Sequence, residues 1–209
     1  MKVVIVMNKD KKIKEVKNEM ENLKKDFDKN YLSLETKLKK LEKGTYEVGD
    51  DVNWCNFDWI VIKTIENEQK VVLMSKEVFE PITYSDNNSN DYSKSNVKEY
   101  LEECFINKLD KSKLVKMRTN YDEDKYVDSL VRIPTLREIE PLSIDQRECG
   151  KTYWTMTSSY ASSADCAYAL VFYVASSGYL NYSNVNWTNP GVRPVIMLNA
   201  ETLIGLQNL

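Results

Sequence analysis

Two different hydrophobic patterns divide the chain near residue 44. Before it, apolar side chains recur at steps of three and four residues, and polar or charged residues fill nearly every position between them. The row consists of Ile13, Val16, Met20, Leu23, Phe27, Tyr31, Leu34, Leu38 and Leu41. An average step of 3.5 residues is typical of a coiled-coil helix, which cannot bury its apolar seam alone. Gly44 ends the pattern, as glycine after a helix commonly does.

We therefore predict an N-terminal coiled-coil helix over residues 1–43 that acts as an oligomerisation stalk. Residues 10–43 are expected to join copies of the chain into a homo-oligomer as a parallel coiled coil. The seam shifts by one residue after Phe27, where Asn30 interrupts one of its two rows and Tyr31 replaces it, so a local change in packing is expected there. A helix docked onto the chain's own domain would bury the same seam and is the alternative.

After Gly44 the pattern changes to short apolar runs of the kind found in strands. Runs within residues 52–62 and 71–74, joined by a polar turn at 66–69, predict a hairpin. Polar residues at 84–95 predict a surface loop, a helix capped near Ser95 follows, and a second loop is expected around residues 120–128. Short strands return from Tyr153 to Leu198. These elements predict an α+β domain over residues 45–209 with mostly antiparallel strands.

The composition excludes several classes of function. The chain of 209 residues contains no histidine, so it has no histidine-based catalytic triad, no histidine metal ligand and no imidazole proton relay. Residues 1–43 carry a net charge of +5 and the remainder carries −8, whereas a nucleic-acid-binding domain is more often basic. We therefore expect no nucleic-acid partner.

Localisation and redox state follow from two further features. The only apolar run near the N-terminus, residues 3–7, is too short for a signal peptide or a membrane span. We expect cytoplasmic synthesis without a signal peptide and no membrane span, for a protein that is then released or associated with a virion. The four cysteines, Cys55, Cys104, Cys149 and Cys166, form no CxxC pair. They are expected to be reduced and mostly buried thiols.

The segment from Gly150 to Ile196 differs in composition from the rest of the chain. Its 47 residues contain three charged side chains and six of the thirteen tyrosines, together with many serines and asparagines. Tyrosine with serine and asparagine is typical of recognition surfaces, because tyrosine supplies a large contact area at a small entropic cost. Ordinary strand aromatics beside a polar turn are the alternative, which we favour for Tyr173 within its apolar run.

If this segment alternates between core and surface, its polar and aromatic residues share one uncharged outer face. The predicted ligand-binding residues are Tyr160, Ser162, Ser163, Asp165, Tyr179, Tyr182, Asn184 and Trp187. The aliphatic residues expected inside are Leu170, Val174, Leu180, Val185, Val192 and Ile196. Trp154 and Arg193 are expected to be structural, the first as the core anchor of its strand and the second as a buried charge that needs several hydrogen-bond acceptors.

The end of the chain resembles a known family. The matching motifs are Tyr153-Trp154-Thr155-Met156-Thr157, then Ser176-Ser177-Gly178-Tyr179-Leu180-Asn181, Val185-Asn186 and Gly191-Val192-Arg193-Pro194-Val195-Ile196. They resemble a bacterial and phage domain of unassigned function, whose ending is similar to the variable regions of C-type-lectin-fold proteins diversified by retroelements. The resemblance covers about residues 45–200 and is specific in the last 45 of them. Met156, Ser158 and Ser177 stand where the family frequently has Arg, Pro and Asp.

The resemblance implies a C-type-lectin-like domain whose final strands and loops display a binding face. It implies a non-enzymatic protein that binds a protein or glycan ligand, without a cofactor. Carboxylates are nearly absent around Trp187-Thr188-Asn189-Pro190, so we expect no calcium or other metal site there. Two alternatives remain: a coiled-coil scaffold with a lectin-like cap, and a copper-dependent oxidase of the formylglycine-generating type that would use Cys149 and Cys166.

Overall fold

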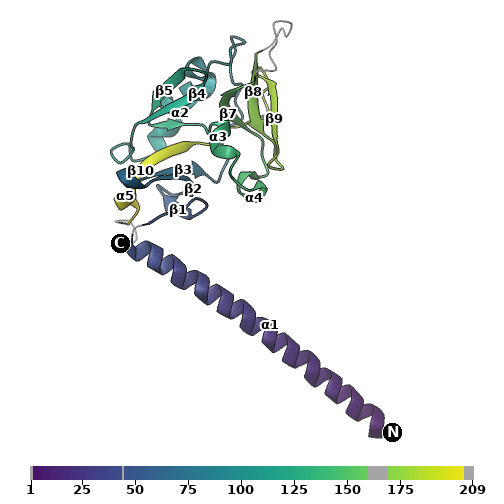
Figure 1. Cartoon of the computed structure of the whole chain (residues 1–209). Coiled ribbons are helices and arrows are strands. Elements are labelled where there is room, and N and C mark those ends of the chain that lie inside the picture. Colours follow the sequence, from purple (N-terminus) through teal and green to yellow (C-terminus); the bar gives the residue numbers. More distant parts are fainter. Residues whose placement is uncertain (1, 44, 160–168, 205–209) are drawn as a thin grey trace. The chain divides into compact units, whose positions relative to one another are not determined.

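The computed structural model describes residues 2–43, 45–159 and 169–204 of the chain. The chain divides into two compact units, Met1–Thr45 and Tyr46–Leu209. The first is a single helix, α1 (Lys2–Lys43), whose side chains are described for residues 11–35. The second holds antiparallel sheets and short helices (Figure 1). The predicted α+β class with an N-terminal helix is confirmed. None of the helices in the described ranges is long and apolar enough to cross a membrane.

Five antiparallel strands form the main sheet of the second unit, in the order β1-β2-β3-β10-β6. They are β1 (Asp51–Trp54), β2 (Phe57–Ile65), β3 (Lys70–Ser75), β6 (Val131–Arg132) and β10 (Val195–Asn199). The predicted hairpin of β2 and β3 is confirmed, with a short 3-10 turn at Glu66–Glu68 between the strands. Strand β10 lies beside β3, with Ile196 opposite Leu73. The last strand of the described ranges therefore lies in the same sheet as the first ones.

The central strands are uninterrupted hydrophobic runs because both faces of the main sheet are buried. One face points Leu73 and Ile196 into a first core, and the other points Met74 and Val195 into a second core. Side chains alternate along a strand, so one run of apolar residues fills both cores in turn.

Short helices cover these cores and connect the strands. Helix α2 (Asn96–Glu103) begins at the predicted cap, where the Ser95 hydroxyl accepts a hydrogen bond from the Lys98 backbone N–H. The other short helices are η2 (Tyr92–Lys94), η3 (Phe105–Lys108), α3 (Leu136–Ile139), α4 (Ile144–Arg147) and α5 (Ala200–Ile204). Val97 and Leu101 of α2 lie in the first core, whereas Ile139 of α3 lies in the second.

Two of the predicted loops differ in the structure. The loop expected around residues 120–128 is instead a hairpin of β4 (Met117–Asp122) and β5 (Lys125–Ser129), whose inward positions alternate with exposed polar ones. The loop at 84–95 is exposed in its middle, but Tyr84 and Tyr92 are completely buried in the first core. Their apolar rings anchor a segment that otherwise carries only polar side chains.

A third sheet carries the segment with the unusual composition. It consists of β7 (Tyr153–Ser158), β8 (Leu170–Val174) and β9 (Leu180–Asn184), with β9 at its edge. Adjacent residues of β7 point to opposite sides, so Tyr153 enters the second core and Trp154 the first. The third sheet is therefore fixed to both cores at its β7 side, and its β9 side lies at the surface of the unit.

Candidate ligand-binding surface

The register of β8 and β9 determines which residues of this sheet share a face. Phe172 lies opposite Tyr182, and Leu170 lies opposite Asn184. All four residues are on the same face, because residues two apart along a strand point to the same side. We call these four residues the β8–β9 face. Tyr182 is 48% exposed and the other three are half-buried, so the face forms part of the surface of the protein.

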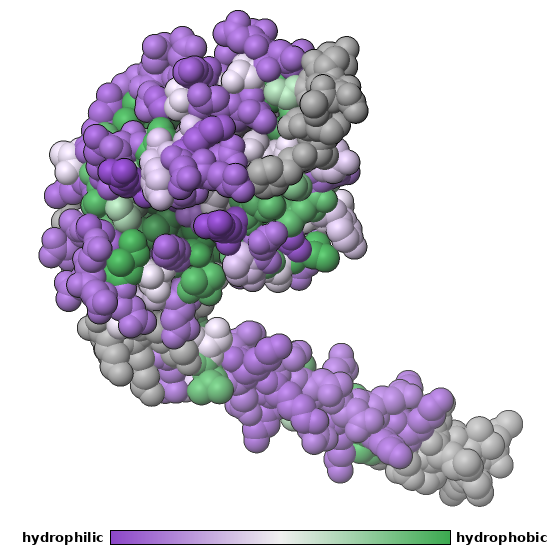
Figure 2. Space-filling view, turned by 45° about the horizontal axis from the view of Figure 1, so that its top comes forward, coloured by the Kyte–Doolittle hydropathy of each residue, from purple (hydrophilic) through white to green (hydrophobic). Residues whose placement is uncertain are grey.

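One half of this side of the sheet is covered and the other half is open. Val174 and Leu180, which are paired across the strands, pack against the second core together with Tyr153. Toward the other end of the strands the second core no longer covers this side. There the rings of Phe172 and Tyr182 meet edge to face, with centroids 6.2 Å apart. In Figure 2, hydrophobic surface gathers on the right of the unit, the side on which Figure 1 shows β8 and β9.

The β8–β9 face has no charged side chain of its own. Residues 166–192 contain no Asp, Glu, Lys or Arg at all. The exposed Tyr182 ring, with half-buried Phe172 and Asn184 beside it, offers apolar contact area together with amide hydrogen-bonding groups. A surface of this kind binds by close contact and hydrogen bonding rather than by attraction between charges.

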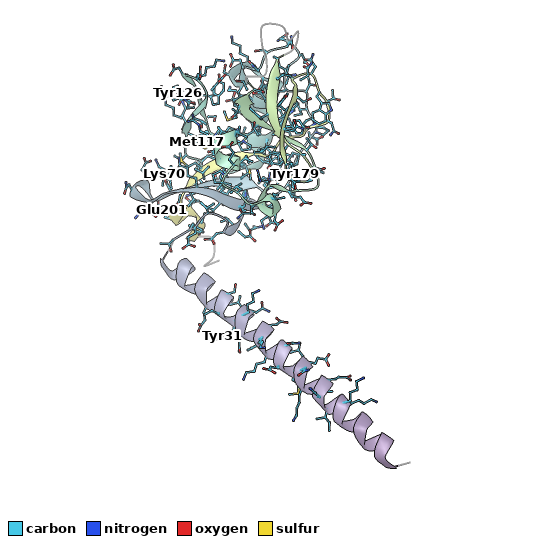
Figure 3. The ribbon with its side chains drawn as sticks, turned by 45° about the vertical axis from the view of Figure 1, so that its right-hand side comes forward. Tyr31, Lys70, Met117, Tyr126, Tyr179 and Glu201 are labelled. Atoms are coloured by element: carbon cyan, nitrogen blue, oxygen red, sulfur yellow. The ribbon has the colours of Figure 1, made fainter. Side chains whose placement is uncertain are left out.

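Tyr179 lies at the far end of the hairpin from Asn184, about 17 Å along the strand at roughly 3.4 Å per residue. The turn that carries it is held by a hydrogen bond from the Ala175 N–H to the Tyr179 carbonyl, 2.8 Å long. Gly178 packs so closely on α4 that a Cβ atom there would lie 2.8 Å from the Ile144 carbonyl oxygen. Figure 3 shows Tyr179 at the surface of the second unit, and its side chain is exposed.

The shared face predicted from the sequence does not extend to Trp187. Its ring lies 4.9 Å from that of Tyr173 and 6.1 Å from that of Trp154, measured between centroids. Tyr173 is on the opposite side of β8 from Phe172. Trp187 is half-buried there, against the first core. A role for Trp187 in ligand binding stays a prediction, but on a different side of the sheet from Tyr182.

Four of the predicted ligand-binding residues, Tyr160, Ser162, Ser163 and Asp165, lie outside the described residues. The strands on either side of them are firmly held. The Ser159 N–H donates to the Leu170 carbonyl, and the Ala169 N–H donates to the Asn88 side chain. Both residues that flank this segment therefore lie at the open end of the β8–β9 face.

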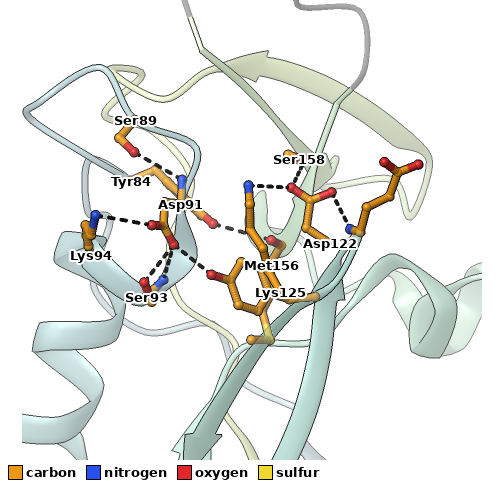
Figure 4. A network of polar contacts seen from close by, with 11 residues as sticks. Tyr84, Ser89, Asp91, Ser93, Lys94, Asp122, Lys125, Met156 and Ser158 are labelled. Carbon is orange, nitrogen blue, oxygen red and sulfur yellow. Dashed lines mark hydrogen bonds and ion pairs between the residues drawn. The ribbon is translucent and has the colours of Figure 1, made fainter.

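A network of polar contacts holds the neighbouring segments together at this end (Figure 4). Asp122 at the end of β4 accepts hydrogen bonds from the Ser158 hydroxyl and the Lys125 ammonium, at 2.8 and 3.0 Å. Asp91 accepts from the Tyr121 hydroxyl at 2.7 Å. Burial acts to raise the pKa of each carboxyl group, but it is outweighed, at Asp91 by the Tyr121 bond together with two bonds from Ser93 and the Lys94 charge, and at Asp122 by the Ser158, Lys125 and Glu123 bonds together with the Lys125 charge, so both pKa values are lowered. Both carboxylates are therefore ionised at neutral pH, and they join the 84–95 loop and β7 to the β4–β5 hairpin.

Trp154 and Arg193 are both buried. The Trp154 indole N–H donates to the Ile82 carbonyl at 2.8 Å, and its ring contacts that of Tyr84. Arg193 is 2% exposed and donates to the carbonyls of Ser75, Gln146 and Arg147. It also donates to the Tyr153 hydroxyl, so β3, α4 and β7 meet at one guanidinium group.

The predicted alternation of inside and outside residues is wrong for part of this sheet. Leu170 and Leu180 are only half-buried, and they lie on the same side as Tyr182 rather than opposite it. This side of the sheet is buried at one end and exposed at the other. A strict alternation of buried and exposed residues does not predict such a change. Val174, Val185, Val192 and Ile196 are buried as expected. Phe172 was missed, although its position two residues before Val174 places it on that side.

Acidic side chains and thiols are the groups of this chain that could hold a metal ion, because it contains no histidine. The described residues contain no group of three or more Cys, Asp or Glu side chains placed to hold one. The thiols predicted to be mostly buried are not: Cys104 is exposed, and Cys55 and Cys149 are half-buried. All three are free, and Cys149 donates a hydrogen bond to the Lys151 carbonyl. Cys166, the predicted partner of Cys149 in a copper site, lies outside the described residues.

Comparisons with protein-family models, with curated proteins and with solved structures found no match to the chain.

Proposed function

We propose that the second unit is a non-enzymatic ligand-binding domain that presents the β8–β9 face to a protein or glycan ligand. The observation that carries this proposal is the exposed Tyr182 ring packed against the half-buried Phe172 ring, in a stretch without charges. Tyrosine is enriched among the residues that contribute most to binding at interfaces, because its ring excludes water from a large area and packs closely against the partner. Asn184 beside Tyr182 supplies amide N–H donors that give such a contact its specificity, while its Oδ1 accepts a hydrogen bond from the Asn186 N–H at 3.0 Å.

The fixed scaffold behind the face supports the same proposal. Binding costs less when the contact residues are already ordered. Strand β8 pairs along its whole length with β9, and β7 anchors both strands to the two cores through Tyr153 and Trp154. The rings of Tyr182 and Phe172 therefore lie on strands that are anchored to the domain, which is a favourable position for a binding site.

We further propose that this domain has the C-type-lectin-like fold of proteins diversified by retroelements and that it serves in receptor recognition, as a phage or adhesin-like protein. The support is the sequence resemblance over its last 45 residues, which includes the strand that carries Tyr182. A near-copy of the corresponding gene segment beside a reverse-transcriptase gene, with differences at adenines, is the genomic observation that tests this part.

The ligand-binding proposal is tested by placing a photo-crosslinking amino acid at Tyr182 in the full chain. The matched control carries the same group at Tyr126 of β5, which is 52% exposed in the same unit. Figure 3 shows Tyr126 on the other side of the unit from Tyr179, which directly precedes β9, the strand that carries Tyr182. The probes are intact cells of candidate host bacteria, for a protein ligand, and a glycan array read with the labelled chain.

We expect crosslinks to a defined cell-surface protein from position 182 and not from position 126, or array binding that Tyr182→Ala abolishes and Tyr126→Ala leaves intact. Equal behaviour of the two positions in both assays would contradict the proposal. If binding requires residues 1–43 and is unaffected by substitutions in the second unit, the coiled-coil scaffold is favoured instead.

A further inference from the structure

The apolar seam of α1 is exposed along its described length. The side chains of Ile13, Val16, Met20, Leu23, Phe27, Tyr31 and Leu34 are between 44% and 68% exposed. They form one continuous row, because residues three and four apart on a helix are neighbours. Soluble chains rarely leave a row of large apolar side chains in water, and such a surface marks an interaction site. The question is what covers it.

The charges beside the seam answer this question. With Ile13 at position a of a heptad, Met20 and Phe27 also occupy a, and Val16 and Leu23 occupy d. The flanking g positions of the two central heptads then hold Glu19 and Asp26, and the flanking e positions hold Lys17 and Lys24. One border of the seam is therefore acidic and the other is basic over this stretch, where its apolar repeat is most regular.

This arrangement gives opposite results for the two possible orientations of a second copy. In a parallel pair each g residue faces the e residue five positions further along the other helix, so Glu19 faces Lys24. In an antiparallel pair that brings Met20 opposite Leu23, like borders meet: Glu19 faces Asp26, and Lys17 faces Lys24. The parallel pair gains attraction across the seam, and the antiparallel pair places like charges together on both borders.

We propose that α1 joins two or more copies of this chain in a parallel, in-register coiled coil, in which Glu19 of one copy pairs with Lys24 of the next. The exposed seam of each copy packs against the same seam of another copy. Such a stalk brings several second units together at one end. If those units bind ligand as proposed above, a multivalent surface then benefits from the high effective concentration of linked sites.

The seam is tested by sedimentation equilibrium of the full chain at micromolar concentration, with no ligand present. Leu23→Asp places a charge in the seam, and Leu32→Asp is the matched control. Leu23 and Leu32 are both 64% exposed, but Leu32 lies outside the row that forms the seam. We expect the unaltered chain and Leu32→Asp to be oligomeric and Leu23→Asp to be monomeric. A monomeric unaltered chain, or equal behaviour of the two variants, would overturn the proposal.

The orientation is tested by Glu19→Lys and Lys24→Glu, because each has opposite effects on the two arrangements. In the parallel pair each substitution replaces an attraction by a repulsion on both borders, so the oligomer dissociates about tenfold more readily at low salt. In the antiparallel pair each substitution removes a repulsion and strengthens association. Lys25→Glu, which makes the same charge change next to Lys24 but away from the seam, should change association little. A tighter oligomer for Glu19→Lys would refute the parallel arrangement.

Because these measurements involve no ligand, their failure leaves the ligand-binding proposal untouched, and the reverse also holds.

Discussion

Arg193→Ala provides a quantitative test of how the binding sheet is attached to the rest of the domain. The guanidinium donates to Ser75 of β3 at 2.7 Å, to Gln146 and Arg147 of α4 at 3.2 and 3.0 Å, and to the Tyr153 hydroxyl at 2.9 Å. It also lies over the Tyr153 ring, 4.9 Å from its centroid. Removing it detaches α4 and β7 from the main sheet at one point.

The size of the effect follows from the acceptors that lose this donor. Without Arg193, the Arg147 carbonyl keeps the hydrogen bond that it accepts from the Tyr153 hydroxyl. The carbonyls of Ser75 and Gln146 lose their bonds to the guanidinium, at about 1–3 kcal/mol for each acceptor left unsatisfied. A loss of about 2–6 kcal/mol corresponds to a melting temperature lowered by roughly 5–20 °C for a domain of this size.

Tryptophan fluorescence is the suitable assay for this variant. All four tryptophans, Trp54, Trp59, Trp154 and Trp187, belong to the second unit, so the signal follows its unfolding and not that of α1. Arg118→Ala is the control, because Arg118 is an exposed arginine that lies over the Tyr126 ring, an interaction worth about 0.5–1 kcal/mol. An unchanged melting temperature for Arg193→Ala would refute the structural role assigned to this residue.

Three other substitutions test the packing around the site by chemical denaturation. Trp154→Phe should lower the free energy of unfolding by about 2–4 kcal/mol, since it shrinks a buried ring and leaves the Ile82 carbonyl without its hydrogen-bond donor. A loss below about 1 kcal/mol would contradict its anchoring role. Gly178→Ala should cost about 1–3 kcal/mol, because φ is +79° and the new methyl group meets α4; an unchanged midpoint would contradict this packing. Burial acts to raise the pKa of Glu138, but the charge and hydrogen bond of Arg132, together with the hydrogen bonds from Thr135, outweigh burial and lower it. The stability that this pair contributes is therefore present above the ordinary carboxyl pKa near 4.5 and lost as the pH falls through the lowered value. Glu138→Gln should destabilise the domain at pH 7, and its difference from the unaltered chain should shrink in acid rather than grow.

The elements that the sequence predicts well are those whose pattern depends on few distant contacts. The seam of α1 repeats over many turns, so its period is evident without knowledge of its partner. The strands β2 and β3 have apolar runs long enough to be buried on both faces. The Ser95 cap follows from a local hydrogen bond.

The β4–β5 hairpin is missed because its burial is hidden among polar residues. Thr119 and Ser129 are buried although neither is apolar, and a sequence with Asp, Glu and Lys at the turn is typical of a loop. The strand character comes from pairing between β4 and β5 and from packing of Tyr121 against Tyr92. Neither contact can be inferred from the local sequence.

The candidate site is predicted in its composition but not in its arrangement. The loss of charge around β8 and β9 is visible in the sequence and correctly indicates that Tyr179 and Tyr182 are exposed. The half of the sheet that is open depends on where α4 and the second core end, which is a tertiary property. Trp187 packs against the rings of Trp154 and Tyr173 on the other side of the sheet, and no local pattern predicts that contact.

The most direct test of the binding proposal is the affinity of the full chain for the ligand identified by crosslinking or on the array, measured by titration calorimetry for Tyr182→Ala and Tyr126→Ala. Because the β8–β9 face is uncharged, we expect the affinity of the unaltered chain to change less than about threefold between roughly 0.05 and 0.5 M NaCl. We expect Tyr182→Ala to weaken binding at least about tenfold, as for an aromatic residue at the centre of an interface, and Tyr126→Ala to leave it unchanged. A steep salt dependence, or a loss of affinity in Tyr126→Ala with none in Tyr182→Ala, would contradict the proposed site.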